Sequence, residues 1–229
     1  MSKVDVMTGA FGAFGKIPTV GDFFRLNTPA GFVSTWDDWM QRSMLAAQTA
    51  LGDQWDDHYM SSPIWRFCLA PTLAGGSKII GVLMPSVDRV GRRFPLTLMA
   101  SFSSPGTIAS DHFRAARLFE RLEALALDAL EDDMSREKLE QRLAEIPPPV
   151  AGCSPSVSRT GHFIAMTGSD VVADLAADRI ADIGARPSIW SAMTGDAQRL
   201  MLCDGLPEGP GAVGLFHMDA PIWRSGQIA

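Results

Sequence analysis

The chain has 229 residues, of which 46% are hydrophobic and 20% charged, as is typical of an ordinary folded globular protein. A chain of this length can form one large or two small domains, with a core that needs no disulfide or metal to hold it. Its formal net charge of −6 argues against a general nucleic-acid binder, because such proteins neutralise phosphates with an excess of Lys and Arg.

Cysteine spacing and the N-terminal segment indicate the cellular compartment. Cys68, Cys153 and Cys203 are far apart and form no Cys-x-x-Cys pair, which fits a reducing environment. The segment Met1–Gly9 lacks the apolar core of a signal peptide. No apolar run approaches the roughly 18 residues that a membrane-spanning helix needs. We therefore expect a cytoplasmic protein without membrane insertion.

Periodicity in the first half predicts a strand, two helices and a group of three strands. Aromatic and Met side chains recur at helical spacing from Phe32 to Leu51, and such a stripe is more typical of a core-facing helix than of a cofactor site. Three apolar, β-rich runs within about 40 residues favour an antiparallel meander. The expected elements are a strand beginning within Phe11–Ile17, helices over Phe32–Leu51 and Gln54–Met60, and strands over Ile64–Ala70, Lys78–Met84 and Phe94–Phe102.

The second half is less sharply patterned, and we expect it to pack against the first. Two or three strands with one helix would not form an obvious independent core. We therefore predict a single domain over residues 1–229, with a possible sub-boundary at the proline run 147–149. The expected elements are a long helix over about 111–131 capped by Ser110-Asp111, a helix from Ser135 to Ile146, a strand over Gly161–Thr167, a helix over Ser169–Ile183, and strands over Ser188–Met193 and Arg199–Cys203.

The stretch Pro85–Pro95 is a candidate binding loop between two predicted strands. A plain hairpin would use a short turn, whereas this connection is about nine residues long. It places Arg89, Arg92 and Arg93 around one glycine, and binding residues are often found on such loops. In one interpretation the arginines contact a partner through paired hydrogen bonds. In the other they pair with Asp22 or Asp88 and hold the loops in place. The two interpretations are compatible with each other.

No combination of residues in the sequence supports catalysis or metal binding. The four histidines (His58, His112, His162 and His217) are scattered, and none has a metal partner at i+2 to i+4. Gly15-Lys16 lacks the spacing of a phosphate-binding loop, and Gly209–Gly214 matches the dinucleotide pattern by chance, because too little chain follows it. We therefore expect a non-enzymatic protein with no catalytic residue, no metal and no cofactor.

Several segments, taken in order and spacing over nearly the whole chain, resemble one known family. The most specific is Gly81–Pro95, which contains Pro-Ser-Val-Asp-Arg-Val-Gly-Arg. The others are Phe14–Pro18 with Gly21–Phe23, Trp36–Trp39, Pro63–Phe67, Ser188–Trp190 and Gly205–Pro207. Together they resemble the TagF/ImpM family of type VI secretion-associated proteins. Family members often carry a second aromatic residue after Trp190, whereas this chain has Ser191.

The resemblance implies an α/β fold of the α+β type, with a mostly antiparallel central sheet and helices on both faces. It also implies a cytoplasmic accessory protein that restrains type VI secretion after translation by binding other components, with the forkhead-associated scaffold protein as a candidate partner. Some members carry a fused phosphatase domain, for which this chain has no room. The candidate contact surface consists of Lys16, Asp22, Arg66, Asp88, Arg89, Arg92 and Arg93.

Two alternatives to the regulator interpretation follow from the same residues. The first is a hydrolase acting on phosphorylated protein, in which the arginines clamp phosphate; only the charge of the loop favours it. The second is a structural component of the secretion apparatus, which would copurify with that apparatus in fixed stoichiometry.

Overall fold

The computed structural model describes residues 9–148, 156–159, 164–167, 170–179, 184–195 and 197–224. Its strands are β1 (Gly12–Gly15), β2 (Phe24–Leu26), β3 (Trp65–Leu69), β4 (Lys78–Met84), β5 (Leu96–Phe102), β6 (Ser156–Arg159), β7 (Ile164–Thr167), β8 (Pro187–Thr194) and β9 (Ala197–Asp204). Its α-helices are α1 (Phe32–Leu51), α2 (Trp55–Met60), α3 (Ile108–Arg114), α4 (Ala116–Asp128), α5 (Arg136–Ala144), α6 (Val171–Arg179) and α7 (Pro210–Phe216). Single 3₁₀ turns span Gly52–Gln54 and Pro221–Trp223.

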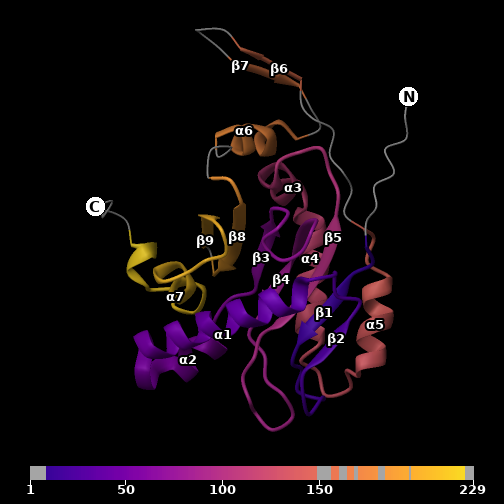
Figure 1. Ribbon diagram of the computed structural model, residues 1–229, viewed down its shortest axis with the longest axis vertical. Helices are drawn as coiled ribbons and strands as arrows, with labels where there is room; N and C mark the ends of the chain where they lie inside the picture. The colour runs from indigo at the N-terminus through magenta and orange to yellow at the C-terminus, as the bar shows by residue number, and fades with distance from the viewer. Residues whose placement is uncertain are drawn as a thin grey trace.

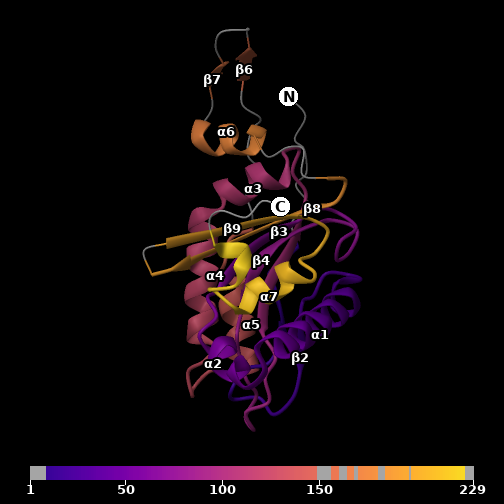
Figure 2. The ribbon, with the colours of Figure 1, turned by 90° about the vertical axis from the view of Figure 1, so that its left-hand side faces the viewer.

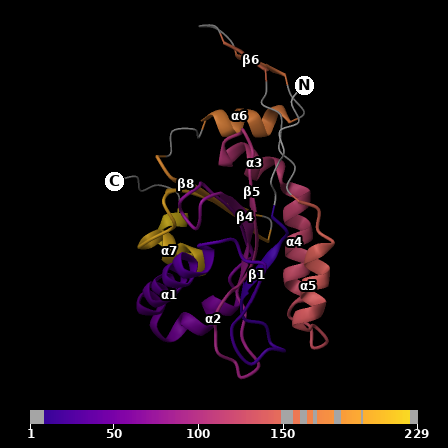
Figure 3. The ribbon, with the colours of Figure 1, turned by 45° about the vertical axis from the view of Figure 1, so that its right-hand side comes forward.

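Seven strands form one sheet in the order β2-β1-β5-β4-β3-β8-β9, and each neighbouring pair is antiparallel. Helices α1, α2 and α7 cover one face, and α3, α4 and α5 cover the other (Figure 3). This arrangement confirms the predicted α+β class with helices on both faces. Strands β6 and β7 form a separate hairpin beyond α6, at the opposite end of the molecule from α2 (Figure 1).

The predicted meander is confirmed by the register of its strands. Phe67 of β3 lies opposite Gly81 of β4, which in turn lies opposite Met99 of β5. Strand β8 adds to the free edge of β3, with Trp190 opposite Phe67. The second half of the chain therefore completes the sheet of the first half, as expected from its lack of an independent core.

The core of the sheet face under α1 is built from tryptophans. Trp36 and Trp39 pack against each other at 4.7 Å between ring centroids, and Trp39 meets Trp190 of β8 at 5.4 Å. The indole N–H groups of both helix residues find buried acceptors: Trp36 donates to Thr97 Oγ1 and Trp39 donates to the Pro207 carbonyl. Buried aromatic rings with satisfied N–H groups supply both apolar area and a fixed orientation. Helix α7 lies beside α1 on this face (Figure 2).

The single helix predicted over 111–131 is wrong, because the chain breaks at Ala115 into α3 and α4. The break lets α3 lie over β3 and β8 while α4 lies over β4 and β5. The true cap is Thr107, whose hydroxyl accepts from Ser110 N at 3.2 Å. The predicted cap residue Asp111 instead forms an ion pair with Lys78 at 2.8 Å.

Several other predictions can be compared only in part. The helix expected from Ser135 to Ile146 is confirmed as α5, and the Ser135 hydroxyl caps it by accepting from Lys138 N. Strand β7 and helix α6 fall within the ranges expected for a strand and a helix, and the rest of both ranges lies outside the described residues. Cys153 and His162 also lie outside them. The sequence pattern does not predict α7, since its Pro- and Gly-rich sequence is a poor helix former.

Candidate functional site: the arginine loop

The segment Pro85–Pro95, here called the arginine loop, connects β4 to β5 at the lower end of the sheet in Figure 1. Contacts between its two sides close this loop into a compact turn. Val87 and Arg93 form a bridge at its base, and Asp88 N donates to the Arg92 carbonyl at 3.1 Å. At the tip Gly91 adopts φ 81° and donates to the Asp88 carbonyl at 2.8 Å. A left-handed residue at this point favours glycine.

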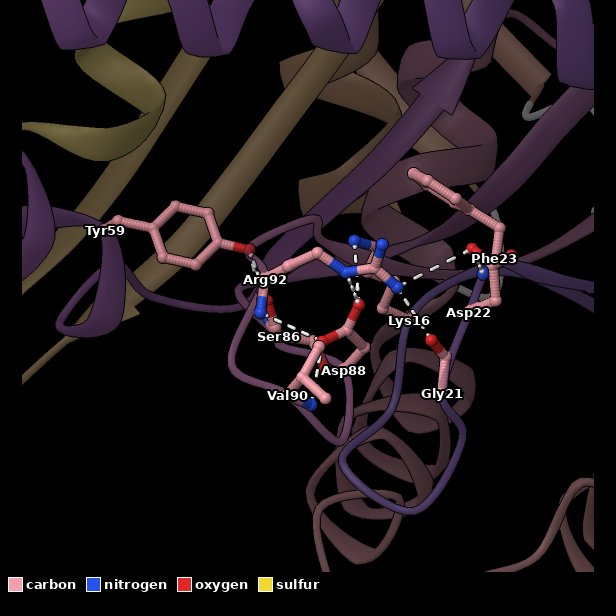
Figure 4. Close-up of polar contacts among 9 residues, drawn as sticks. All are labelled: Lys16, Gly21, Asp22, Phe23, Tyr59, Ser86, Asp88, Val90 and Arg92. Atoms are coloured by element: carbon pink, nitrogen blue, oxygen red, sulfur yellow. Dashed lines mark hydrogen bonds and ion pairs between the residues drawn. The ribbon is translucent and has the colours of Figure 1, made fainter.

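Asp88 organises the loop from within. It is only 2% exposed. Its Oδ1 accepts from Val90 N at 3.0 Å and Arg92 N at 2.9 Å. Its Oδ2 accepts from Arg92 Nε at 2.6 Å and lies 3.1 Å from Lys16 Nζ (Figure 4). A buried carboxylate is tolerated when such charge-assisted hydrogen bonds surround it.

These contacts set the charge state of Asp88. Burial alone raises the pKa of its carboxyl group, but the hydrogen bonds from the Arg92 backbone N–H, Lys16, the Arg92 side chain and Val90 N outweigh burial. The pKa of Asp88 therefore lies well below its usual range, because these donors favour the ionised form. At neutral pH the carboxylate is ionised and fully engaged by donors.

A second segment, between β1 and β2, holds the arginine loop from the side. Arg92 Nη2 donates to the Gly21 carbonyl at 2.7 Å, and Arg89 N donates to the Val20 carbonyl at 3.1 Å. Lys16 is 4% exposed and its Nζ lies 4.6 Å from the centre of the Phe23 ring. The base of the arginine loop is therefore fixed by contacts that cross between β1–β2 and β4–β5.

Gly15 makes this close approach possible. It adopts φ 133°, and a Cβ built on it would lie 2.1 Å from the Pro95 carbonyl oxygen at the end of the arginine loop. Only glycine combines that backbone conformation with that proximity. The Phe14–Pro18 segment, one of those on which the family resemblance rests, is thus tied to the geometry of the arginine loop.

The structure brings together most of the predicted contact residues. Lys16, Asp22, Asp88 and Arg92 form one cluster, in which Arg92 Nη2 lies 4.0 Å from Asp22 Oδ1. The exposed Arg89 side chain packs over Gly21, where an added Cβ would lie 3.1 Å from its Nη2. Some charges of the loop therefore hold it in place, as one interpretation expects, while others face solvent, and contact with a partner stays a prediction.

Two of the predicted contact residues, Arg93 and Arg66, pair with carboxylates outside the Asp88 cluster. Arg93 reaches across to Asp56 of α2 at 2.8 Å. Arg66 does not join the cluster. Its guanidinium forms two 2.7 Å hydrogen bonds with Glu123 of α4, on the face of the sheet opposite α1. The predicted grouping of Arg66 with the arginine loop is therefore wrong, because its position in β3 directs its side chain toward α4.

Sequence reasoning missed two residues that fix the start of the arginine loop. The Tyr59 hydroxyl at the end of α2 donates to the Ser86 carbonyl at 2.7 Å and accepts from Ser86 N at 3.0 Å (Figure 4). Burial raises the pKa of Tyr59 well above its usual range, so it remains a neutral donor. Tyr59 is the sole tyrosine of the chain, but its helical spacing gives no indication of this contact.

The polar groups outside the loop include one partly buried pair, His112 and Ser191, and no metal-binding group among the described residues. No three His, Cys, Asp or Glu side chains in that part of the chain gather in a metal-binding group. His112 Nε2 lies 2.8 Å from Ser191 Oγ, but burial, and then the charge of Arg66, lower the pKa of His112 to about 3. Among the described helices, none is long and apolar enough to cross a membrane.

Comparison with known families decides the affiliation of the chain. Residues 12–146, from β1 to just beyond α5, match the profile of the TagF N-terminal domain, described as type VI secretion system-associated. This match covers more than half of the chain and includes the arginine loop. The chain belongs to the TagF family.

A solved structure is similar to nearly the whole chain, including the part beyond residue 146. The crystal structure of PA0076 from Pseudomonas aeruginosa PAO1 is 31% identical, with a TM-score of 0.72, and the match covers 96% of this chain and 97% of that chain. A search of curated proteins gives no match.

The segments that carry the family resemblance include a set of core residues and the arginine loop. Trp36, Trp39, Trp190 and Pro207 meet in the core, so in this chain they specify the TagF fold rather than a surface. The Gly81–Pro95 segment includes β4 residues and the arginine loop. This segment presents the exposed Arg89 and Arg92 side chains to solvent, while Gly21–Phe23 presents Asp22 and Trp36–Trp39 presents Asp38.

Proposed function

We propose that this TagF-family protein is a cytoplasmic accessory protein that restrains type VI secretion after translation by binding another component of the apparatus. The forkhead-associated scaffold protein is the candidate partner. Family membership supports the association with type VI secretion. The proposed contact surface is the arginine loop, together with Lys16 and Asp22.

One observation carries the proposal: the arginine loop is rigid at its base and exposed at its tip. Buried Asp88 accepts four hydrogen bonds or ion pairs, whereas Arg89, Val90, Gly91 and Arg92 are exposed. A loop already ordered before binding loses little conformational entropy when a partner binds. Exposed arginines on such a loop are suited to carboxylate or phosphate groups, because the guanidinium makes paired hydrogen bonds.

We propose binding rather than hydrolysis as the role of this surface. A hydrolase would need a base or nucleophile beside the phosphate clamp. The carboxylate that Arg92 binds is Asp88, whose lowered pKa and full set of donors make it unsuited to proton transfer, and the Asp56 carboxylate is held in an ion pair by Arg93. The His112–Ser191 pair belongs to α3 and β8 rather than to the loop, and a pKa of about 3 makes His112 a weak base.

Secretion in the host bacterium tests the proposal. A strain lacking the gene should secrete more type VI substrate than the parent strain, and the wild-type protein should restore the parental level. Arg89→Glu at equal cellular abundance should fail to restore it. Arg117→Glu on α4 is the matched control, since this arginine is also exposed but lies on another element. Unchanged or reduced secretion in the deletion strain would contradict a restraining role.

A phosphopeptide assay addresses the hydrolase alternative. The purified protein should not turn over phosphopeptides with or without divalent metals. Turnover that is lost in Arg89→Glu and kept in Arg117→Glu would instead favour an enzyme.

A further inference from the structure

We propose that a hollow at the start of the arginine loop is an anchor pocket for one large apolar side chain in an acidic segment of the partner protein. This inference rests on the proposed function, since it names how the partner would be held. The hollow, here called the anchor pocket, has a volume of about 310 Å³. Its walls include Pro18, Met60, Met84, Ser86, Leu127 and Leu130.

The anchor pocket collects exposed apolar side chains from elements far apart in the sequence. Met60 at the end of α2 is 55% exposed, Leu127 of α4 is 54% exposed and Leu130 just after α4 is 38% exposed. Scattered exposed apolar residues are normal, but several that line one hollow indicate a binding site. Two of the lining residues, Met60 and Met84, are methionines, whose flexible side chains adapt to different apolar partners.

Ser86 supplies the polar feature of the anchor pocket. The residue is 1% exposed and its Oγ has no hydrogen-bond partner among the described groups. Its backbone N–H and carbonyl are both held by the Tyr59 hydroxyl, so the position of the residue is fixed. A buried hydroxyl without a partner is unfavourable, and a ligand group that pairs with it would remove that cost. Apolar walls with one or two polar groups are typical of binding pockets.

Charge beside the anchor pocket selects an acidic occupant and orients it. The start of the arginine loop, at Ser86 and Val87, forms part of the pocket wall. Further along the loop the Arg89 side chain is exposed and makes no ion pair with any described carboxylate, and the Arg92 side chain is 57% exposed. On the other side, Glu131 and Asp132 follow Leu130. Opposite charges across an interface fix its register. The partner segment would therefore place its acid toward the loop and its uncharged end toward Leu130.

Selection of displayed random peptides on the purified full chain tests the anchor pocket and requires no identified partner. The selected peptides should carry a large apolar residue with Asp or Glu a few positions to one side. Met60→Glu should weaken their binding about tenfold or more, as expected for loss of a buried anchor contact. Leu45→Glu is the matched control, because Leu45 of α1 is 63% exposed and does not line the pocket.

Two further variants separate the polar contribution from folding. Ser86→Ala should weaken peptide binding several-fold without lowering the melting temperature, because the lost hydroxyl has no partner among the described groups of the unbound protein. Arg89→Glu should change the selection from acidic to basic peptides. Peptides that bind Met60→Glu as tightly as the wild type, or that show no acidic preference, would overturn the proposal.

The same variants distinguish failure of the anchor pocket from failure of the proposed function. If the wild type and Met60→Glu capture the same type VI component equally well, the pocket assignment is wrong and the regulator function stands. If the selected acidic peptides require Met60 and Arg89 but no type VI component is captured, the anchor pocket is supported and the proposed function fails.

Discussion

Acid should destabilise this TagF-family protein through His112, and replacing His112 should remove that part of the acid sensitivity. The side chain is 3% exposed and lies against the rings of Phe113 and Phe119, with centroid distances of 5.6 and 4.9 Å. Burial first, and then the positive charge of Arg66, lower the pKa of His112 to about 3. The folded protein therefore holds this imidazole neutral at every pH near neutrality.

The magnitude follows from proton linkage. In the unfolded chain the His112 imidazole titrates near its ordinary pKa of about 6.5. Between pH 6.5 and pH 3 the unfolded state binds more protons than the folded state, so the free energy of unfolding falls as the pH falls. The whole interval corresponds to a penalty on the order of 5 kcal/mol, at about 1.36 kcal/mol per pH unit. At pH 4 the penalty from His112 alone is about 3 kcal/mol relative to pH 7.

Urea unfolding followed by tryptophan fluorescence measures this effect. Wild type and His112→Phe are compared at pH 7 and pH 4, so that the carboxylates, which titrate in both proteins, cancel in the comparison. The wild type should lose about 3 kcal/mol more than the variant between the two pH values. An equal loss in both proteins would refute the reasoning, as would an NMR titration showing His112 protonated in the folded state above pH 5.

Other variants test separate parts of the fold and site. Gly15→Ala should destabilise the protein by roughly 3 kcal/mol in urea unfolding, because φ is 133° there and the new Cβ would meet the Pro95 carbonyl; a change below about 1 kcal/mol would contradict this geometry. Trp39→Phe should cost roughly 1–3 kcal/mol by the same assay, since the buried Pro207 carbonyl loses its donor. Arg89→Ala should leave the melting temperature unchanged in calorimetry, whereas a marked drop would assign that side chain a structural role instead.

The elements with strong periodicity could be predicted from the sequence. The apolar stripe from Phe32 to Leu51 repeats at helical spacing, and its members are the buried positions of α1. The β3–β4–β5 meander followed from short apolar runs separated by turns. In both cases the local pattern and the tertiary packing favour the same structure, so the pattern is sufficient.

Elements that depend on tertiary contacts could not be predicted in this way. The apolar spacing continues across Ala115, so nothing local marks the break between α3 and α4; docking over different strands sets it. Helix α7 has poor intrinsic propensity, and the indole N–H groups of Trp65 and Trp223 donate to the carbonyls of Leu215 and Gly214 within it. Such acceptors are visible only once the fold brings them together.

The candidate site, like the fold, could be predicted from the sequence only in part. The sequence identified the arginine loop and left open whether its charges bind a partner or hold the loop in place. The structure places Asp88 beside Lys16, which comes much earlier in the chain, and directs Arg66 to Glu123 instead. Local sequence gives no information about which strands far apart in the chain will be neighbours, such as β1 and β5. The contact between the Ser86 backbone and the Tyr59 hydroxyl could not have been inferred from residue types alone.

Quantitative affinity capture from the protein's own cell lysate tests the central claim most directly. Wild type and Arg89→Glu would be used in equal amounts, after calorimetry has shown that their melting temperatures are equal. Arg117→Glu is the control, and the captured proteins are quantified by mass spectrometry. We predict that the forkhead-associated scaffold or another type VI component is enriched by wild type and by Arg117→Glu but lost with Arg89→Glu. Capture of no type VI component by the wild type would contradict the account, and equal capture by all three would remove the arginine loop as the contact surface.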